Sequence, residues 1–262
     1  MNYTLITGST SGIGLNFARR LAKLGHNVFL VSNQEKELLS VSAELEKDFG
    51  IKTKTLFIDL AREEAAYEVF DFCQKENIKV NILVNNAGMF FFKYFSNTDI
   101  SLITKILYLH VFTPVLLCKL FSDEMKKSGE QCHILNMSSI AAYMKLPTIT
   151  LYGSTKALLK NFSNAIYEEL LHSNISVTTV CPGAVATDLY NLSEKYKKLG
   201  VKLGIIIPPE KLVEKAISKM FKRKKQYIPA PVVNRPAIWL TSHLPSFIIQ
   251  IIMRKIEPLM KM

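Results

Sequence analysis

The sequence lacks the marks of several protein classes. Its four cysteines are far apart in apolar surroundings, and none forms a Cys-x-x-Cys pair. This spacing argues against a zinc site or any other bound metal and against a disulfide framework, and it fits a reducing compartment. The first residues show no charged region followed by a long apolar core, so we expect no secretory signal and a cytoplasmic protein. No internal repeat or low-complexity stretch divides the chain.

Length and charge narrow the choices further. The 262 residues, 48% of them hydrophobic, suffice for one large α/β domain or two small ones. The net charge of +11 is unevenly distributed, because residues 200–262 hold 12 Lys/Arg and 3 Asp/Glu, a net of +9. The first 199 residues hold 21 and 19, a net of +2. A local basic excess of this kind fits an anionic membrane, nucleic acid or plain solubility.

A glycine-rich turn follows the first predicted strand. The apolar stretch 3–7 leads into Gly8-Ser-Thr-Ser-Gly12-Ile-Gly14, and a helical stretch runs from Leu15 to Leu24. Glycines at such a junction let backbone N–H groups approach a pyrophosphate, which the helix N-terminus stabilises. We interpret the turn as a dinucleotide site, and a tight turn without ligand is the alternative.

The end of the second predicted strand bears on the choice of dinucleotide. This strand covers 27–31 and is followed by Ser32-Asn33-Gln34. An acid here binds the ribose 2′-hydroxyl of NAD, and a basic residue receives the 2′-phosphate of NADP. The chain has neither, and because the acid is missing we favour NADP over NAD.

Two further predicted strands end in polar residues. The strand 54–58 precedes Asp59-Leu60, where the carboxylate can accept from an adenine amine or cap the next helix. The strand 80–84 precedes Asn85-Asn86-Ala87-Gly88, a turn suited to the side of a nucleotide. An apolar cluster follows, Met89-Phe-Phe-Phe92 and Tyr94-Phe95. It either lines a substrate cleft or belongs to the core.

A tyrosine and a lysine four residues apart suggest proton transfer. Tyr152 and Lys156 are expected on one face of a helix, one turn from each other. A free phenol has a pKa of about 10, and a nearby ammonium lowers it. Ser139, after the apolar strand 132–137, carries a hydroxyl that can hold a substrate oxygen against the phenol. A surface helix with an unrelated Tyr–Lys pair is the alternative.

The order of elements predicts an α/β fold. Strands alternate with helices, which gives a doubly wound parallel sheet with helices on both faces. The strand 175–180 ends at Cys181-Pro-Gly183-Ala-Val185-Ala-Thr187, where the backbone and the Thr187 hydroxyl can face a cofactor amide. Ligands bind at the carboxyl ends of the strands in such sheets, and these motifs lie at those ends.

The C-terminal part has a different character. Residues 188–207 show no firm period and predict a mobile flap over the cleft. We divide the chain into a dinucleotide-binding catalytic domain, 1–230, and a basic, apolar tail, 231–262. The tail is too broken to span a bilayer, with His243 and Pro245 in its middle. A peripheral membrane anchor and a helix that covers the cleft or contacts a second copy both remain open.

Together these motifs resemble the short-chain dehydrogenase/reductase family, over residues 3 to about 230. The resemblance implies a single-domain Rossmann-type fold with a seven-stranded parallel sheet and a C-terminal helical tail. It also implies homodimers or homotetramers, and reversible hydride transfer between NADP or NAD and a small-molecule carbonyl or alcohol. The order of the motifs looks most like reductases related to steroid and 3-ketoacyl reductases.

The resemblance also implies a role for each matched residue. Tyr152 would be the general acid/base, Lys156 would lower its pKa and hold the nicotinamide ribose hydroxyls, and Ser139 would orient the substrate oxygen. The implied cofactor contacts are Gly8, Ser9, Thr10, Ser11, Gly12, Ile13, Gly14, Asn33, Asp59, Leu60, Asn86, Ala87, Gly88, Tyr152, Lys156, Pro182, Gly183, Val185 and Thr187.

One position departs from the family pattern. The family usually has an asparagine in the helix before the catalytic strand, where it holds a water that joins the lysine to solvent, and His110 stands there in this chain. A histidine with a pKa near 6.5 would make such a relay pH-sensitive. A histidine without a catalytic part is the alternative.

We therefore expect an oxidoreductase that acts on an apolar ketone, such as a 3-oxoacyl or steroid-like compound. The alternative is a nucleotide-binding regulatory or scaffold protein that has lost turnover; the intact Ser139, Tyr152 and Lys156 argue against it and His110 argues for it. Nucleic-acid binding through Lys222–Lys225 is not expected, because a few basic residues by a helix end are usually a solvated face.

Overall fold

The computed structural model describes residues 1–190, 193–245 and 247–251, and its centre is one seven-stranded sheet. The strand order is β3-β2-β1-β4-β5-β6-β7, and every neighbouring pair is parallel. The strands are β1 Asn2–Thr7, β2 Asn27–Ser32, β3 Thr53–Phe57, β4 Lys79–Asn85, β5 Cys132–Met137, β6 Ile175–Val180 and β7 Gln226–Tyr227. The predicted doubly wound parallel sheet is confirmed.

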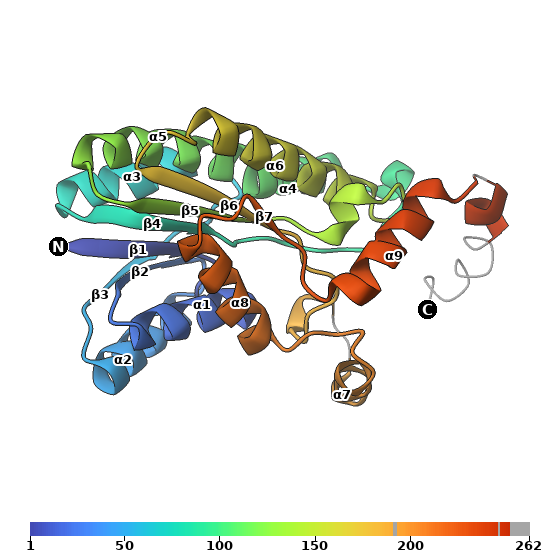
Figure 1. Ribbon diagram of the computed structural model, residues 1–262, viewed down its shortest axis with the longest axis horizontal. Coiled ribbons are helices and arrows are strands. Elements are labelled where there is room, and N and C mark those ends of the chain that lie inside the picture. Colours follow the sequence, from blue (N-terminus) through green and yellow to red (C-terminus); the bar gives the residue numbers. More distant parts are fainter. Residues whose placement is uncertain (191–192, 246, 252–262) are drawn as a thin grey trace.

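Helices cover both faces of the sheet (Figure 1). One face carries α1 Gly12–Lys23, α2 Glu35–Phe49 and α8 Pro209–Phe221, and the other carries α3 Ala65–Lys75, α5 Thr113–Ser128 and α6 Thr150–Glu169. Phe17 of α1 and Leu212 of α8 belong to the first of two apolar layers, and Leu117 and Phe121 of α5 belong to the second. Because both faces are covered, the central strands are buried on both sides.

Several polar side chains of the central strands pair with a neighbouring strand or with a helix that covers the sheet. Every residue of β5 and β6 is buried. His133 Nδ1 lies 2.7 Å from Ser176 Oγ on the neighbouring strand, and the Asn136 amide donates to Ser163 Oγ of α6 at 2.8 Å. These pairings satisfy polar atoms that would otherwise be costly to bury.

The strand order creates a crevice where the chain changes direction. From β1 the chain proceeds to β2 and β3 on one side, and it then crosses over to β4 and the strands beyond on the other. The crevice lies at the carboxyl ends of β1 and β4, the usual position of ligands in open α/β sheets.

A long helical stretch, Ile100–Ser128, precedes β5. It consists of α4 Ile100–Leu107, a π-helical turn Tyr108–Phe112, and α5. Within the described residues it is the one helix whose length and composition would suffice to cross a membrane. Here α5 contacts α3, and α4 and the π-helical turn contact α6.

The segment 188–207 has more regular structure than its sequence indicated. A short 3-10 turn, Asp188–Tyr190, is followed after the undescribed residues 191–192 by α7 Glu194–Lys202. Val185 and Ile207 then form an isolated parallel bridge that closes the segment onto the strand-end turn. The mobility of this flap stays a prediction.

The tail begins with α9, Pro231–His243, which projects past the end of the sheet (Figure 1). Its start agrees with the expected beginning of the tail at residue 231, although the division of the chain at that point stays a prediction. The part of the tail from 252 to 262, with Arg254 and Lys255, lies outside the described residues.

Candidate active site

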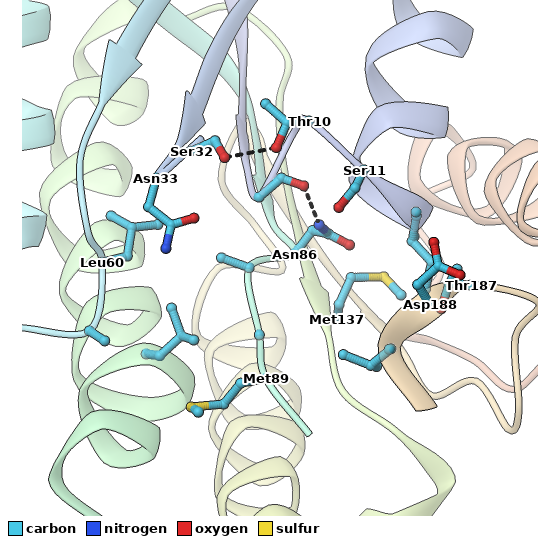
Figure 2. Close-up of a pocket in the computed structure, with 18 of the residues that line it drawn as sticks. Thr10, Ser11, Ser32, Asn33, Leu60, Asn86, Met89, Met137, Thr187 and Asp188 are labelled. Carbon is cyan, nitrogen blue, oxygen red and sulfur yellow. Dashed lines mark hydrogen bonds between the residues drawn. The ribbon is translucent and has the colours of Figure 1, made fainter. Parts of the chain in front are cut away.

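A pocket of about 580 Å³ lies at the carboxyl ends of the strands (Figure 2). Most of the predicted site residues line it: Gly8, Thr10, Ser11, Gly12, Ile13, Asn33, Asp59, Leu60, Asn86, Ala87, Gly88, Ser139, Tyr152, Lys156, Pro182, Gly183, Val185 and Thr187. Ser9, Gly14 and His110 do not line it. The sheet therefore brings together residues from seven separate stretches of chain.

The glycine turn forms one wall of the pocket. Gly8 and Gly12 have φ values of +64° and +51°, a left-handed conformation that favours glycine. A Cβ on Gly14 would lie 1.9 Å from the Gly8 carbonyl oxygen, so only glycine lets α1 start this close to the turn. Ser9 lies beneath the turn, where its hydroxyl donates to the Val31 carbonyl at 3.4 Å.

Asn86 joins the end of β4 to this turn. Its side-chain amide donates to the carbonyl oxygens of Thr7 and Gly8 at 3.0 and 3.2 Å, and the Asn86 amide points toward the turn in Figure 2. The Thr7 hydroxyl accepts from the backbone N–H groups of Asn86 and Ala87, each at 3.0 Å. The sequence analysis missed Thr7, whose signal is a hydroxyl residue at the last position of a first strand.

The end of β2 presents an uncharged polar corner. The Thr10 and Ser32 hydroxyls lie 2.8 Å apart (Figure 2). The Thr10 hydroxyl also donates to Gln34 Oε1 at 2.6 Å. Asn33 lines the pocket beside them. No side chain in this short stretch could repel a phosphate.

Asp59 reaches the pocket without capping a helix. Its Oδ1 accepts from the backbone N–H of Ala61 at 2.9 Å, within its own turn. Since α3 begins only at Ala65, the alternative of a cap for the next helix is wrong. Asp59 and Leu60 both face the pocket.

Tyr152 and Lys156 lie together at the opposite wall. Both are buried, on the first turns of α6, and Lys156 Nζ lies 5.8 Å from the centroid of the Tyr152 ring. The ammonium donates to the Met137 carbonyl at the end of β5, at 2.9 Å. The Ser138 hydroxyl donates to the Lys156 carbonyl at 2.7 Å, which fixes α6 to the same strand end. Ser138 was missed as a contributor, although it is next to Ser139.

Burial lowers the pKa of Lys156 to about 8. A charged ammonium loses its hydration inside the protein, and the neutral form is favoured in consequence. Near pH 7 most of the Lys156 side chains still carry the charge, because the solution pH is below this pKa. The charge is therefore available beside the phenol.

Ser139 lines the same pocket as Tyr152. Its hydroxyl oxygen accepts from the Ala141 N–H at 3.1 Å, and its hydroxyl lies 3.4 Å from the Pro182 carbonyl. Phe90 contacts the Tyr152 ring edge-on, with centroids 4.8 Å apart. Ser139 and Tyr152 thus line the same pocket, and Phe90 packs against the phenol ring.

His110 lies behind this wall and is almost fully buried. Its Nε2 accepts from the Met89 N–H at 2.9 Å, and its Nδ1 lies 3.0 Å from the Thr155 hydroxyl oxygen. Burial and the Lys156 charge lower the pKa of His110 well below its usual value. The expectation of a group that titrates near 6.5 is therefore wrong.

The first turns of α9 also touch the site. Asn234 is buried and its amide donates to the Pro229 carbonyl at 2.6 Å. A Cβ on Gly183 would lie 2.6 Å from Asn234 Oδ1, so the tail packs directly on the Pro182-Gly183 turn. Asn234 was missed, and its signal is a polar residue inside an apolar stretch.

Comparison with known proteins identifies the family. The family model for short chain dehydrogenases matches residues 2–198. The chain belongs to the short chain dehydrogenase family.

Relatives are about 30% identical to this member of the family over the region that matches. Very-long-chain 3-oxoacyl-CoA reductase of Homo sapiens is 32% identical over 193 residues, which are 71% of this chain and 60% of that protein. Hydroxysteroid dehydrogenase-like protein 1 of Gallus gallus is 30% identical over 203 residues, 75% of this chain and 59% of that protein. The matched region thus spans about three fifths of each relative.

A solved relative has the same fold over nearly its whole length. The short-chain dehydrogenase from Sphingobium yanoikuyae in complex with NADPH superposes with a TM-score of 0.78. It is 26% identical, and the match covers 94% of this chain and 97% of that one.

The buried charge leads to a prediction for Lys156→Met. Because the folded-state pKa of about 8 is below the unfolded value of about 10.4, the charged lysine destabilises the fold, and below pH 8 this is on the order of 3 kcal/mol. The variant should therefore unfold at an equal or higher temperature than the parent at pH 7. This advantage should shrink as the pH rises from about 8 toward 10.4, where the folded parent sheds its proton first. Calorimetry at several pH values measures the unfolding temperature at pH 7 and its change with pH. A variant that unfolds several degrees below the parent at pH 7 would contradict a destabilising buried charge on Lys156.

Proposed function

We propose that this protein is an NAD(P)-dependent oxidoreductase that transfers hydride reversibly between nicotinamide and a carbonyl or alcohol. The observation that carries the proposal is the Tyr152–Lys156 pair, which lines the same pocket as the glycine turn. The turn fits a pyrophosphate, because Gly8, Gly12 and Gly14 carry no side chains of their own to shield its backbone N–H groups. The relative from Sphingobium yanoikuyae, solved with NADPH, supports the cofactor class.

Each residue of the wall has a distinct part in this proposal. The Tyr152 hydroxyl gives a proton to the carbonyl oxygen, and it takes the proton back in the reverse direction. The Lys156 ammonium stabilises the phenolate and contacts the nicotinamide ribose, and Ser139 holds the carbonyl oxygen by a hydrogen bond. The bound cofactor supplies the hydride.

The polar corner at β2 supports NADP over NAD. A carboxylate at this corner would repel a 2′-phosphate, and Ser32, Asn33 and Gln34 carry no charge. The Asn33 side-chain amide lines the pocket at this corner and can donate to phosphate oxygens.

An apolar ketone is the substrate class that the wall suits. Met89 lines the pocket, and Phe90 packs on the Tyr152 ring. The relatives named for 3-oxoacyl-CoA and hydroxysteroid chemistry support a bulky, apolar substrate.

The replacement Tyr152→Phe tests the reaction. It removes the proton donor and keeps the ring, so the rate of NADPH oxidation with a reactive ketone should fall about 10²- to 10⁴-fold. The thermal shift produced by NADPH should remain. Tyr67→Phe, on the far helix α3, is the matched control and should keep the parent rate. Parent-level activity in the Tyr152 variant would overturn the assignment, and binding without turnover on a broad carbonyl panel would favour a scaffold.

We also propose that the tail attaches reversibly to anionic membranes. Four large apolar side chains in or after α9 are 51% to 65% exposed: Trp239, Leu240, Phe247 and Ile251. Residues 231–251 contain Arg235 and no acidic residue, and the whole tail holds four Lys/Arg against one Glu. Exposed apolar side chains together with a basic excess suit the surface of an anionic bilayer. Cytoplasmic location and assembly into dimers or tetramers stay predictions.

The single tryptophan of the chain makes the membrane proposal measurable. Vesicles that contain phosphatidylserine should shift Trp239 emission to the blue and co-sediment with the protein, and added salt should weaken both effects. The double change Trp239→Ser with Leu240→Ser should reduce co-sedimentation by at least about tenfold, because each buried side chain contributes roughly 1.5–3 kcal/mol. Leu39→Ser, on the exposed face of α2, is the control and should leave it unchanged. If the parent and the double variant co-sediment with vesicles equally, the membrane anchor is wrong. The alternative is then a contact with a second copy of the chain, which a measurement of the protein's mass in solution would show.

A further inference from the structure

His110 links two parts of the site that are far apart in the sequence. It belongs to the π-helical turn between α4 and α5 and is 1% exposed. One ring nitrogen bonds to the loop after β4, at Met89, and the other to α6, at Thr155. The loop bounds the pocket at Gly88 and Met89, and α6 carries Tyr152 and Lys156.

The two bonds define the protonation state of the ring independently. A backbone N–H can only donate, so the bond from Met89 requires Nε2 without a proton. The Thr155 hydroxyl donates its own hydrogen to the Tyr152 carbonyl at 2.9 Å, so it accepts from His110, and Nδ1 must carry the proton. Both bonds therefore assign the same neutral tautomer, with the proton on Nδ1.

We propose that His110 is a positioning residue that clamps the Gly88–Met89 backbone to α6 and that it does not relay protons. The space between these parts is already full. A Cβ on Gly88 would lie 3.1 Å from His110 Nε2 and 3.6 Å from Lys156 Nζ. The imidazole thus sets how closely the Gly88–Met89 loop approaches Lys156. The effect of this clamp on catalysis rests on the proposed function.

A relay through His110 has no free position on the ring. Both nitrogens are engaged, and the cavity beside the ring, lined by Asn85, His110 and Lys156 among others, measures about 10 Å³. A volume of this size is at the lower limit for a single water. Tyr152 packs edge-on against the ring, and the charge of the nearby Lys156 opposes a second proton on it.

Two amide variants separate the two bonds. In His110→Gln the side-chain oxygen can reach the Nε2 position and still accept from Met89, whereas in His110→Asn the amide can only replace Nδ1 toward Thr155. The clamp therefore predicts that His110→Asn loses about tenfold or more in kcat/KM, the equivalent of one hydrogen bond, and that His110→Gln loses less. A water relay predicts the reverse, because asparagine is the residue that the family resemblance places here. His172→Asn, on the surface beyond α6, is the control and should be unaffected.

A measurement on the parent protein decides the matter without a variant or turnover. Nitrogen NMR of ¹⁵N-histidine-labelled protein should show His110 protonated at Nδ1 and unchanged between about pH 5 and 8. A proton on Nε2, a titration within that range, or His110→Asn at or above the activity of His110→Gln would overturn the clamp. If the parent binds NADPH and reduces no carbonyl, the proposed function fails, and the NMR result still decides the clamp.

Discussion

The site depends on one buried charge. The Lys156 ammonium is held by the last carbonyl of β5, beneath the Tyr152 ring, and burial brings its pKa to about 8. A lone buried charge opposes folding, so the surrounding sheet and helices must be stable enough to hold it. Ser138, which fixes α6 to the end of β5, and the packing of Tyr152 against Phe90 serve to hold the charge and the phenol in register.

The parallel sheet explains how distant parts of the chain meet around this charge. All seven strands point the same way, so the turns that follow them gather at one edge. Asn86 and Thr7 lock the turn after β4 onto the glycine turn after β1, and Asn234 of the tail closes on the turn after β6. The dinucleotide half and the proton-transfer half of the pocket therefore lie along one edge of the sheet.

The strands were predictable because strands buried on both faces leave continuous apolar runs between glycine and polar turns. Their order in the sheet was not predicted from these runs and comes from the structure. Most pocket-lining residues were predictable for a related reason. The polar residues that follow parallel strands all lie at the carboxyl edge of the sheet, which is where the pocket lies. The partners of these residues were not predictable. The Thr10–Ser32 contact and the His110 tautomer depend on contacts between segments far apart in sequence. α7 was missed because its mostly exposed, lysine-rich surface leaves no apolar period to read.

The most direct test of the central claim is a crystal structure of the protein with NADPH and a slowly reacting ketone. The account predicts that Lys156 Nζ lies within hydrogen-bond distance of the nicotinamide ribose hydroxyls, about 2.7–3.2 Å. It also predicts the carbonyl oxygen against the Tyr152 and Ser139 hydroxyls, with its carbon about 3–3.5 Å from nicotinamide C4. A nicotinamide ring bound away from Tyr152, or a lysine that contacts no part of the cofactor, would contradict it.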